Sequence, residues 1–181
     1  MENVDRLDFG SSLNMTGAMA QLATALQQKH WRLATAESCT GGLIATCCTD
    51  LPGSSAWFEG GVVAYSNAAK MALLGVSPLL LEQQGAVSQA VAMAMAEGAV
   101  QRLSVDCALA TTGIAGPAGG TIDKPIGLVW LAWAFKGYPS QAQALYLDGN
   151  RAQIRWQATF VAIQAILHSE MIIKGLPPYG N

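Results

Sequence analysis

The sequence predicts an α/β fold, a three-layer α/β/α sandwich around a mixed sheet of about five strands. Two observations support this prediction. Along the first two thirds of the chain, short apolar strands alternate with helices, which is the pattern of parallel strands joined by crossover helices. Later, two apolar runs at residues 127–135 and 141–147 are separated by only 5 residues. A connection that short joins antiparallel neighbours.

The expected elements follow from apolar spacing and capping residues. Met15, Met19, Leu22 and Leu26 fall on one face of a helix expected over residues 13–28. The elements expected next, in chain order, are a strand over 32–36, a helix over 41–49, a strand over 60–65, a helix over 68–74, a helix capped by Ser88 that reaches about residue 103, and a strand over 106–111.

The segment 111–125, TTGIAGPAGGTIDKP, is expected to be a loop because it holds 4 glycines and 2 prolines. Long ordered loops in compact domains are usually functional. After the two antiparallel strands, a single helix is expected over 151–173. The predicted organisation is a loose tail at 1–12, one domain at 13–174 and a C-terminal tail at 175–181.

Composition limits the class of partner. Hydrophobic residues make up 51% of the 181 residues and charged residues 12%, against about 25% charged in an average domain. This excludes a disordered chain and suggests that a second subunit covers part of the surface. The net charge of −2 provides no broad basic face for nucleic acid, but small anionic ligands remain possible because they need only one or two local cations.

No membrane segment is expected. The longest clean apolar run, residues 126–135, has 10 residues, about half of what a spanning helix needs. The first residues are acidic and lack the apolar stretch of a signal peptide. The sequence therefore predicts a cytoplasmic protein that does not associate with membranes.

Neither a metal nor a cofactor is expected. The chain has no CxxC motif, and its only histidines, His30 and His168, lie far from the cysteines in sequence. The four cysteines are expected to be reduced and to pack as small core side chains: Cys39, Cys47, Cys48 and Cys107.

The first candidate for chemistry is the segment TAESCTGG, residues 35–42. It falls where a strand stops and a helix begins, so backbone N–H groups of the helix N-terminus would point into a crevice. Ser38 would stand at that junction, and Gly41 and Gly42 would let a substrate approach the backbone. An ordinary helix cap is the alternative, and the motif alone favours it.

A nucleophilic serine needs a base, and neither histidine is well placed to be one. Lys70 stands at the start of an otherwise apolar helix. Burial and the positive helix end would bring the pKa of its amine well below the usual value of about 10.4. Val63, Met71 and Leu74 are expected to bury it, and Tyr65 offers a hydroxyl on the same edge. The alternative is a surface lysine with a buried stem.

The second glycine-rich segment, TTGIAGPAGG, also follows a strand. Thr112, Gly113, Ile114 and Gly116 would present backbone N–H groups and a hydroxyl to a phosphate. The segment matches neither the Walker motif nor G-x-G-x-x-G. Two such loops at strand ends are better evidence for one cleft than either is alone.

Two arginines, Arg151 and Arg155, open the last helix one turn apart. Either can clamp a phosphate or a carboxylate, but for Arg155 a surface pair with Asp148 is the preferred interpretation, whereas Arg151 is open between the two. Three tryptophans are expected in the core, namely Trp130, Trp133 and Trp156. Three polar residues are expected at the rim of a cleft, namely Glu37, Asp123 and Lys124.

Six segments in this order resemble the CinA C-terminal domain family: TAESCTGG, GSSAWFEGGVVAYSNAAK, GAVS, TTGIAGPAGG, KPIGLVW and the start of the Arg151 helix. The resemblance runs from about residue 22 to residue 167, nearly the whole domain. Within the family the chain is most similar to the stand-alone nicotinamide mononucleotide deamidase group. The resemblance implies hydrolysis of the carboxamide of nicotinamide mononucleotide to nicotinate mononucleotide and ammonia, by a metal-free Ser–Lys amidohydrolase that forms a homodimer.

The resemblance also implies roles for residues that match the family's motifs. Ser38 would be the nucleophile, Lys70 the base and Tyr65 its assistant. Substrate would contact two groups of residues: Cys39, Thr40, Gly41 and Gly42, whose segment supplies backbone N–H groups for the oxyanion; and Thr112, Gly113, Ile114, Gly116 and the phosphate-side Arg151.

This chain departs from the family pattern at one point. The family's GDR before the last helix is Asp148-Gly149-Asn150-Arg151 here, and the extra Asn150 could displace Arg151. Larger family members carry an N-terminal molybdopterin-binding-like domain, for which these 181 residues are expected to leave no room.

Two alternatives remain open at this point. The cleft could serve a non-catalytic nucleotide-binding regulatory domain, or an amidase that acts on another amide-bearing nucleotide or on an amino-acid amide. A serine with an adjacent base favours catalysis, because a domain that only binds has little need of a base beside a serine.

Overall fold

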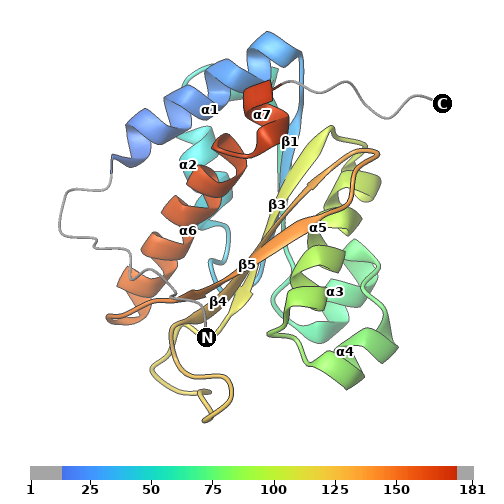
Figure 1. Ribbon diagram of the computed structural model, residues 1–181, viewed down its shortest axis with the longest axis vertical. Coiled ribbons are helices and arrows are strands. Elements are labelled where there is room, and N and C mark those ends of the chain that lie inside the picture. The colour runs from blue at the N-terminus through green and yellow to red at the C-terminus, as the bar shows by residue number, and fades with distance from the viewer. Residues whose placement is uncertain (1–13, 175–181) are drawn as a thin grey trace.

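The computed structural model describes residues 14–174 and contains a five-stranded mixed sheet between two helical layers (Figure 1). The strand order is β2-β1-β3-β4-β5. β1 pairs in parallel with β2 and β3, whereas β4 runs antiparallel to both β3 and β5. The strands are β1 (Leu33–Glu37), β2 (Phe58–Val63), β3 (Cys107–Gly113), β4 (Leu128–Phe135) and β5 (Gln141–Tyr146). The predicted sandwich is confirmed.

The helices divide between the two faces of the sheet, as Figure 1 shows. The first layer contains α1 (Met15–Lys29), α2 (Leu43–Thr49), α6 (Arg151–Leu167) and α7 (Glu170–Lys174). The second contains α3 (Asn67–Leu74), α4 (Pro78–Gln84) and α5 (Gln89–Leu103). A short 3-10 helix, η1 (Ser54–Ala56), precedes β2.

Each face of the sheet has its own apolar core, because alternate residues of a strand point to opposite faces. Leu33 of β1 belongs to the core under α1 and α6, and Ala34 and Ala36 belong to the core under α5. The second layer packs closely: a Cβ on Gly98 of α5 would lie 2.1 Å from the carbonyl oxygen of Leu74. α3 is therefore held tightly against α5.

This topology brings three strand ends together. The chain leaves β1 for one neighbour, β2, and later returns to the other side as β3, so the strand order reverses at β1. Crevices at such reversal points lie at the carboxyl ends of the strands. Ser38 follows β1, Ala64 follows β2, and Gly113 ends β3 at this same edge.

Two boundaries differ from prediction for reasons of backbone geometry. α2 begins at Leu43 rather than at 41, because Gly41 and Gly42 have left-handed φ values of +64° and +93°. β3 runs to Gly113, so the expected loop over 111–125 begins three residues too early. A Cβ on Gly113 would lie 2.6 Å from the Leu128 carbonyl oxygen, so glycine here permits strand pairing rather than a turn.

Other elements also differ from prediction. Helix α4 was not predicted, although Pro78 at its first position after Ser77 is a common helix start. The last predicted helix, 151–173, is two helices, which separate where the Ser169 hydroxyl donates to the Ile166 carbonyl oxygen. The strand expected over 60–65 is β2, which begins two residues earlier and ends at Val63.

The predicted tails, 1–12 and 175–181, lie outside the described residues. Between residues 14 and 174, no helix has both the length and the apolar character needed to cross a membrane. All four cysteines are buried and free, as predicted.

Candidate active site

Ser38 and Lys70 meet at the carboxyl edge of the sheet. Ser38 is the first residue after β1, and Lys70 lies in the first turn of α3. The Nζ atom of Lys70 lies 3.0 Å from the Oγ atom of Ser38, although 32 positions separate them. Ser38 is 7% exposed and Lys70 only 1%, so Lys70 is not a surface lysine. The contact between the Lys70 amine and the Ser38 hydroxyl is therefore almost fully shielded from solvent.

Two backbone carbonyls complete the surroundings of the amine. Lys70 Nζ donates to the carbonyl oxygens of Ala64 at 3.0 Å and Tyr65 at 3.2 Å. Loss of hydration on burial lowers the pKa of Lys70, while the nearby thiol of Cys39 acts weakly in the opposite direction. The predicted direction of the pKa shift agrees with this geometry.

The expected burial of Lys70 by three apolar side chains is only partly right. Leu74 is buried and Met71 is half-buried, but Val63 is 48% exposed. The turn that carries Ser38 and the chain after β2 surround the amine instead. α3 begins where it does because the Ser66 side chain accepts from the Ala69 N–H and caps its first turn.

Tyr65 contacts Lys70 through its backbone and not through its hydroxyl. The Tyr65 side chain is 62% exposed, and its Oη atom accepts from Arg151 Nη2 at 3.3 Å. The predicted assistance by a tyrosine hydroxyl therefore has no direct contact with the amine here. What reaches the amine is the Tyr65 carbonyl, which a sequence motif cannot show.

Glu37 caps helix α2, which corrects the expectation that the α2 N-terminus points into an open crevice. Its carboxylate accepts from the N–H groups of Gly42 at 2.9 Å, Ile44 at 3.1 Å and Ala45 at 2.9 Å. The side chain is 1% exposed, so it is not at a rim. The strand that ends at Ser38 thus supplies the anion that the helix N-terminus attracts, leaving those donors unavailable to a ligand.

The turn that carries Ser38 is also fixed by β3 and α6. The Ser38 N–H donates to the Thr111 carbonyl oxygen at 2.9 Å, and the Oγ1 atoms of Thr40 and Thr111 lie 2.7 Å apart. Arg155 Nε and Nη2 both donate to the Thr40 carbonyl oxygen, at 3.2 and 2.6 Å. The predicted surface pair of Arg155 with Asp148 is wrong, because the guanidinium binds this buried turn.

Cys39 is buried beside Ser38, and burial raises the pKa of its thiol to about 11. The backbone N–H groups of Cys39 and Thr40 point toward the sulfur and offset part of this rise. Because only the thiolate is a strong nucleophile, the neutral thiol leaves Ser38 as the better candidate nucleophile in this turn.

The expected phosphate donors on β3 and after it are engaged within the chain. The Thr112 hydroxyl donates to the Ala86 carbonyl oxygen at 2.8 Å, and Thr112 is 1% exposed. The Ile114 N–H donates to the Leu128 carbonyl oxygen at 2.9 Å. Gly113, the last residue of β3, is half-buried, and Gly116 in the following loop is buried. A substrate would displace these contacts or bind beside them.

Arg151 is exposed and connects three parts of the site edge. Its Nη1 donates to the Gly116 carbonyl oxygen at 2.8 Å, and its Nη2 to Tyr65 Oη. Asn150 is the N-cap of α6 and forms a capping box with Gln153. The extra asparagine therefore fixes the helix start and leaves Arg151 at the first helical position, near Tyr65.

The structure thus joins most predicted residues into one network, from Arg151 through Tyr65 and Lys70 to Ser38 and Thr40. The carbonyl of Ala64 and the hydroxyl and carbonyl of Thr111 had no role in the site assigned from sequence, and Arg155 had been assigned to a surface pair instead. The capping role of Glu37 did have a signal in the sequence, because it is an acidic residue directly before Ser38, where a strand ends and a helix begins. Among the described residues, no group of three or more histidine, cysteine, aspartate or glutamate side chains could hold a metal ion.

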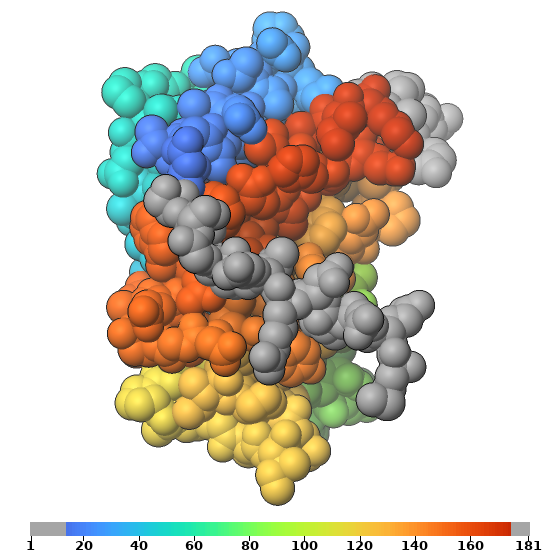
Figure 2. All heavy atoms as spheres, turned by 60° about the vertical axis from the view of Figure 1, so that its left-hand side comes forward, coloured from blue at the N-terminus to red at the C-terminus, as the bar shows by residue number. Residues whose placement is uncertain are grey.

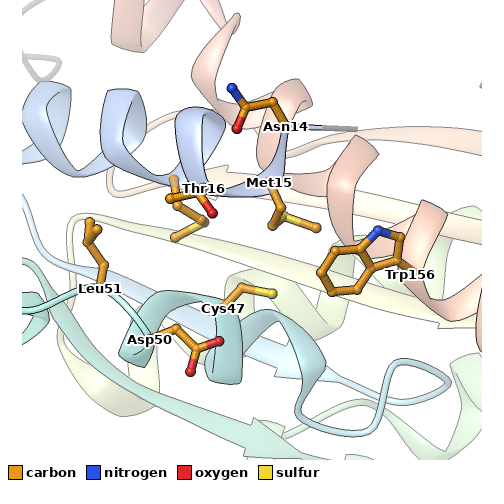
Figure 3. Close-up of a pocket in the computed structure, with 8 residues that line it drawn as sticks. Asn14, Met15, Thr16, Cys47, Asp50, Leu51 and Trp156 are labelled. Atoms are coloured by element: carbon orange, nitrogen blue, oxygen red, sulfur yellow. The ribbon is translucent and has the colours of Figure 1, made fainter. Parts of the chain in front are cut away.

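A separate groove of about 320 Å³ lies between α1, α2 and α6 (Figure 3). In Figure 3 the side chains of Met15, Cys47 and Trp156 face one another across it. Trp130 and Trp133 are half-buried and pack against the two apolar cores, as expected, whereas Trp156 is 39% exposed and belongs to neither core. None of the candidate site residues lines the groove.

Comparison with known proteins places this arrangement in a family. The profile of the CinA C-terminal domain matches residues 15–170. A nicotinamide-nucleotide amidohydrolase PncC from Enterobacter agglomerans is 47% identical over 147 residues, which are 81% of this chain and 90% of that protein. A CinA-like protein from Mycobacterium marinum is 53% identical over 135 residues, 75% of this chain, but the match spans only 32% of that longer protein.

Solved structures agree with the sequence comparison. A CinA-superfamily protein from Klebsiella pneumoniae superposes with a TM-score of 0.84 at 35% identity, covering 89% of this chain and 99% of that one. A competence/damage-inducible protein from Agrobacterium tumefaciens gives a TM-score of 0.82 at 39% identity, covering 84% and 93%. By sequence profile and by fold, this chain belongs to the CinA C-terminal domain family.

Proposed function

We propose that this protein hydrolyses the carboxamide of nicotinamide mononucleotide, giving nicotinate mononucleotide and ammonia. The observation that carries the proposal is the 3.0 Å contact between the buried amine of Lys70 and the hydroxyl of Ser38. The substrate is inferred from the amidohydrolase relative, because the match spans 90% of its length.

The geometry around the amine supports a basic role for Lys70. A neutral amine has two N–H donors and one lone pair. The carbonyl oxygens of Ala64 and Tyr65 accept hydrogen bonds only, so they take both N–H groups. In this neutral form the lone pair is left for the third neighbour and would accept from the Ser38 hydroxyl, whereas a protonated amine donates to Ser38 Oγ. Burial favours this neutral form by lowering the pKa of the amine.

The proposed reaction uses this pair twice. Ser38 Oγ attacks the amide carbon as its proton moves to Lys70 Nζ, and the carbonyl oxygen becomes an oxyanion. The ammonium of Lys70 then gives the proton to the leaving nitrogen, and ammonia departs. Water, deprotonated by the neutral amine, hydrolyses the ester on Ser38. The two carbonyls stabilise the ammonium while it exists.

Backbone donors for the oxyanion are limited to a few groups. The Ser38 N–H is bound to Thr111, the Gly41 N–H to Ser38, and the Gly42 N–H to Glu37. The N–H groups of Cys39 and Thr40 face only a thiol, which is a weak acceptor. We assign the oxyanion to these two donors, which narrows the set of oxyanion donors expected in the segment from Cys39 to Gly42.

Substrate binding stays a prediction in its details. Arg151 is exposed beside Tyr65 and Gly116, where its remaining N–H groups can bind a phosphate. Thr112, Gly113, Ile114 and Gly116 would line the same side. A cytoplasmic homodimer without metal or cofactor belongs to the same proposal, supported by the resemblance and by the low charged fraction of 12%.

The deciding experiment measures ammonia release from nicotinamide mononucleotide, its riboside, free nicotinamide, other amide-bearing nucleotides and amino-acid amides. Each substrate is tested with wild type and Ser38→Ala, before and after dialysis against a chelator. We expect turnover of the mononucleotide that Ser38→Ala abolishes and the chelator does not change. Binding without ammonia release would favour the regulatory-domain alternative. Preference for another amide would retain the reaction class and correct the substrate.

A further inference from the structure

We propose that Arg155 of α6 is a positioning residue for the oxyanion donor, acting through two peptide groups of the Ser38 turn that a hydrogen bond links to each other. The inference rests on the proposed amide hydrolysis and adds a residue that does not contact the reacting atoms. Arg155 stands one helical turn after Arg151, and the two arginines have different tasks in this arrangement.

The guanidinium of Arg155 is committed to a single backbone oxygen. Nε and Nη2 donate to the Thr40 carbonyl at 3.2 and 2.6 Å, and charged donors make stronger hydrogen bonds than neutral ones. The side chain is half-buried, and the ion pairs found in residues 14–174 do not include it. A Cβ on Gly41 would lie 3.4 Å from Nη2, so the guanidinium packs directly against the turn.

This contact reaches the catalytic edge through planar peptide groups. The Thr40 carbonyl shares its peptide plane with the Gly41 N–H, which donates to the Ser38 carbonyl oxygen at 3.1 Å. The Ser38 carbonyl shares its plane with the N–H of Cys39. Fixing the Thr40 oxygen therefore fixes, two planes away, the direction of the Cys39 N–H.

The same series of hydrogen bonds also polarises the two peptide groups. Hydrogen bonds in series strengthen one another by about 10–30% per bond in a medium of low dielectric constant. The positive guanidinium beside the Thr40 carbonyl oxygen makes the Gly41 N–H a better donor. The stronger bond from this N–H to the Ser38 carbonyl in turn makes the Cys39 N–H a better donor. The oxyanion would therefore be held by an N–H that Arg155 both orients and strengthens.

The contacts on the other side of the turn do not duplicate this effect. The Thr40 hydroxyl is bound to the Thr111 hydroxyl, and the Ser38 N–H to the Thr111 carbonyl. These bonds anchor the turn to β3 but do not reach the peptide group between Thr40 and Gly41. Loss of Arg155 should therefore leave the turn folded, with one peptide plane less restrained.

The test compares Arg155→Gln and Arg155→Lys with the matched control Arg151→Gln, under steady-state conditions with nicotinamide mononucleotide. Removing an oxyanion donor costs about 10²–10³ in kcat, and weakening one should cost about 10- to 100-fold. We expect Arg155→Gln to lower kcat by this factor with KM within about twofold, because the lost interaction belongs to the transition state. Arg155→Lys should recover part of kcat. Arg151→Gln should mainly raise KM.

Two further readouts separate positioning from general destabilisation. The pH at which activity rises should be the same in Arg155→Gln as in wild type, because the Arg155 side chain donates its hydrogen bonds to the Thr40 carbonyl and not to Lys70. In ligand-free protein, the amide proton resonances of Gly41 and Cys39 should move upfield in Arg155→Gln, and the midpoint of urea unfolding should change little. Arg155→Lys serves if the glutamine variant does not fold.

Wild-type kcat in Arg155→Gln, or unchanged resonances of both amides, would overturn the inference. A rise in KM alone would also overturn it, since that result would make Arg155 a substrate-binding residue. If the wild-type protein releases no ammonia from any amide, the proposed function fails. The two amide resonances then decide by themselves whether Arg155 controls the turn.

Discussion

Two glycine-rich segments follow neighbouring strands, yet the protein holds them in different ways. The turn at 37–42 is fixed by Glu37 to α2, by Thr40 to β3 and by Arg155 to α6. The loop between β3 and β4 projects from the body of the protein and forms the lower end of the view in Figure 2. Its Ile122 is 100% exposed.

The loop is attached mainly near its two ends. Arg151 donates to the Gly116 carbonyl oxygen, and Lys124 Nζ to the Gln84 carbonyl oxygen at 2.9 Å. Catalytic atoms must be held to a fraction of an ångström, whereas recognition loops tolerate adjustment. This difference is consistent with the proposed function, in which the turn carries the reacting groups and the loop contacts the substrate. Substitutions in each segment test this division.

The largest effect is expected from Ser38→Ala. If Ser38 is the nucleophile, kcat should fall by about 10⁴–10⁶, as for the loss of other serine nucleophiles. Folding and nucleotide binding should be nearly unchanged, because only one hydroxyl is removed. Single-turnover kinetics and calorimetric titration with substrate measure both. Near-normal kcat in this variant would remove Ser38 from the mechanism.

Lys70→Met should also abolish turnover, and pH is the sharper probe. Because the pKa of Lys70 is lowered in the folded protein, wild-type activity should rise with pH through that pKa and then level off. Between that pKa and about 10.4 the unfolded chain binds more protons than the folded protein, so this group makes wild-type stability rise with pH.

Lys70→Met lacks this dependence and should be no less stable than wild type at neutral pH. Urea unfolding of both proteins between pH 6 and about 10 measures the difference. An NMR titration of the Lys70 amine provides the direct check. A pKa at or above its ordinary value in the folded protein would exclude Lys70 as the resting base.

Glu37→Ala tests how far the turn depends on its carboxylate. Three N–H groups of α2 lose their acceptor, and the expected loss of unfolding free energy is about 2 kcal/mol. Glu37→Gln retains one acceptor oxygen and should lose less. Urea denaturation measures both variants. Equal stability of Glu37→Ala and wild type would mean that water caps α2 as well as the carboxylate does.

Arg151→Gln tests the loop side of the comparison. A charged hydrogen bond to phosphate is worth about tenfold in affinity or more, so kcat/KM on the mononucleotide should fall about tenfold. The riboside, which lacks the phosphate, should be affected much less. Equal losses on both substrates would show that Arg151 acts through Tyr65 and Gly116 rather than through the phosphate.

Ile122→Ser should have the smallest effect. An exposed side chain at a loop tip contributes little, and the unfolding free energy should change by less than about 0.5 kcal/mol. Thermal unfolding of the variant beside wild type measures the change. A markedly larger loss would show that another surface covers Ile122 in solution.

The sequence alone determined the layers of the fold and the two segments that form the candidate site. Apolar periodicity and the short connection before β5 are local properties, so they predicted the mixed sheet without knowledge of distant contacts. Ser38 and Lys70 were singled out as candidates by their places at a strand end and in an apolar helix, and the family resemblance, rather than either position alone, favoured catalytic roles for them. The lowered pKa of Lys70 followed from its expected burial.

Only the tertiary structure decided which polar group meets which. Arg155 pairs with the Thr40 carbonyl, 115 positions away, instead of with nearby Asp148. The Tyr65 carbonyl, not its hydroxyl, faces Lys70. Every residue carries a backbone donor or acceptor regardless of its side chain, so a sequence cannot show where those groups point. Their directions are set when strand ends and helix starts pack together, and in this site they orient the amine and the Ser38 turn.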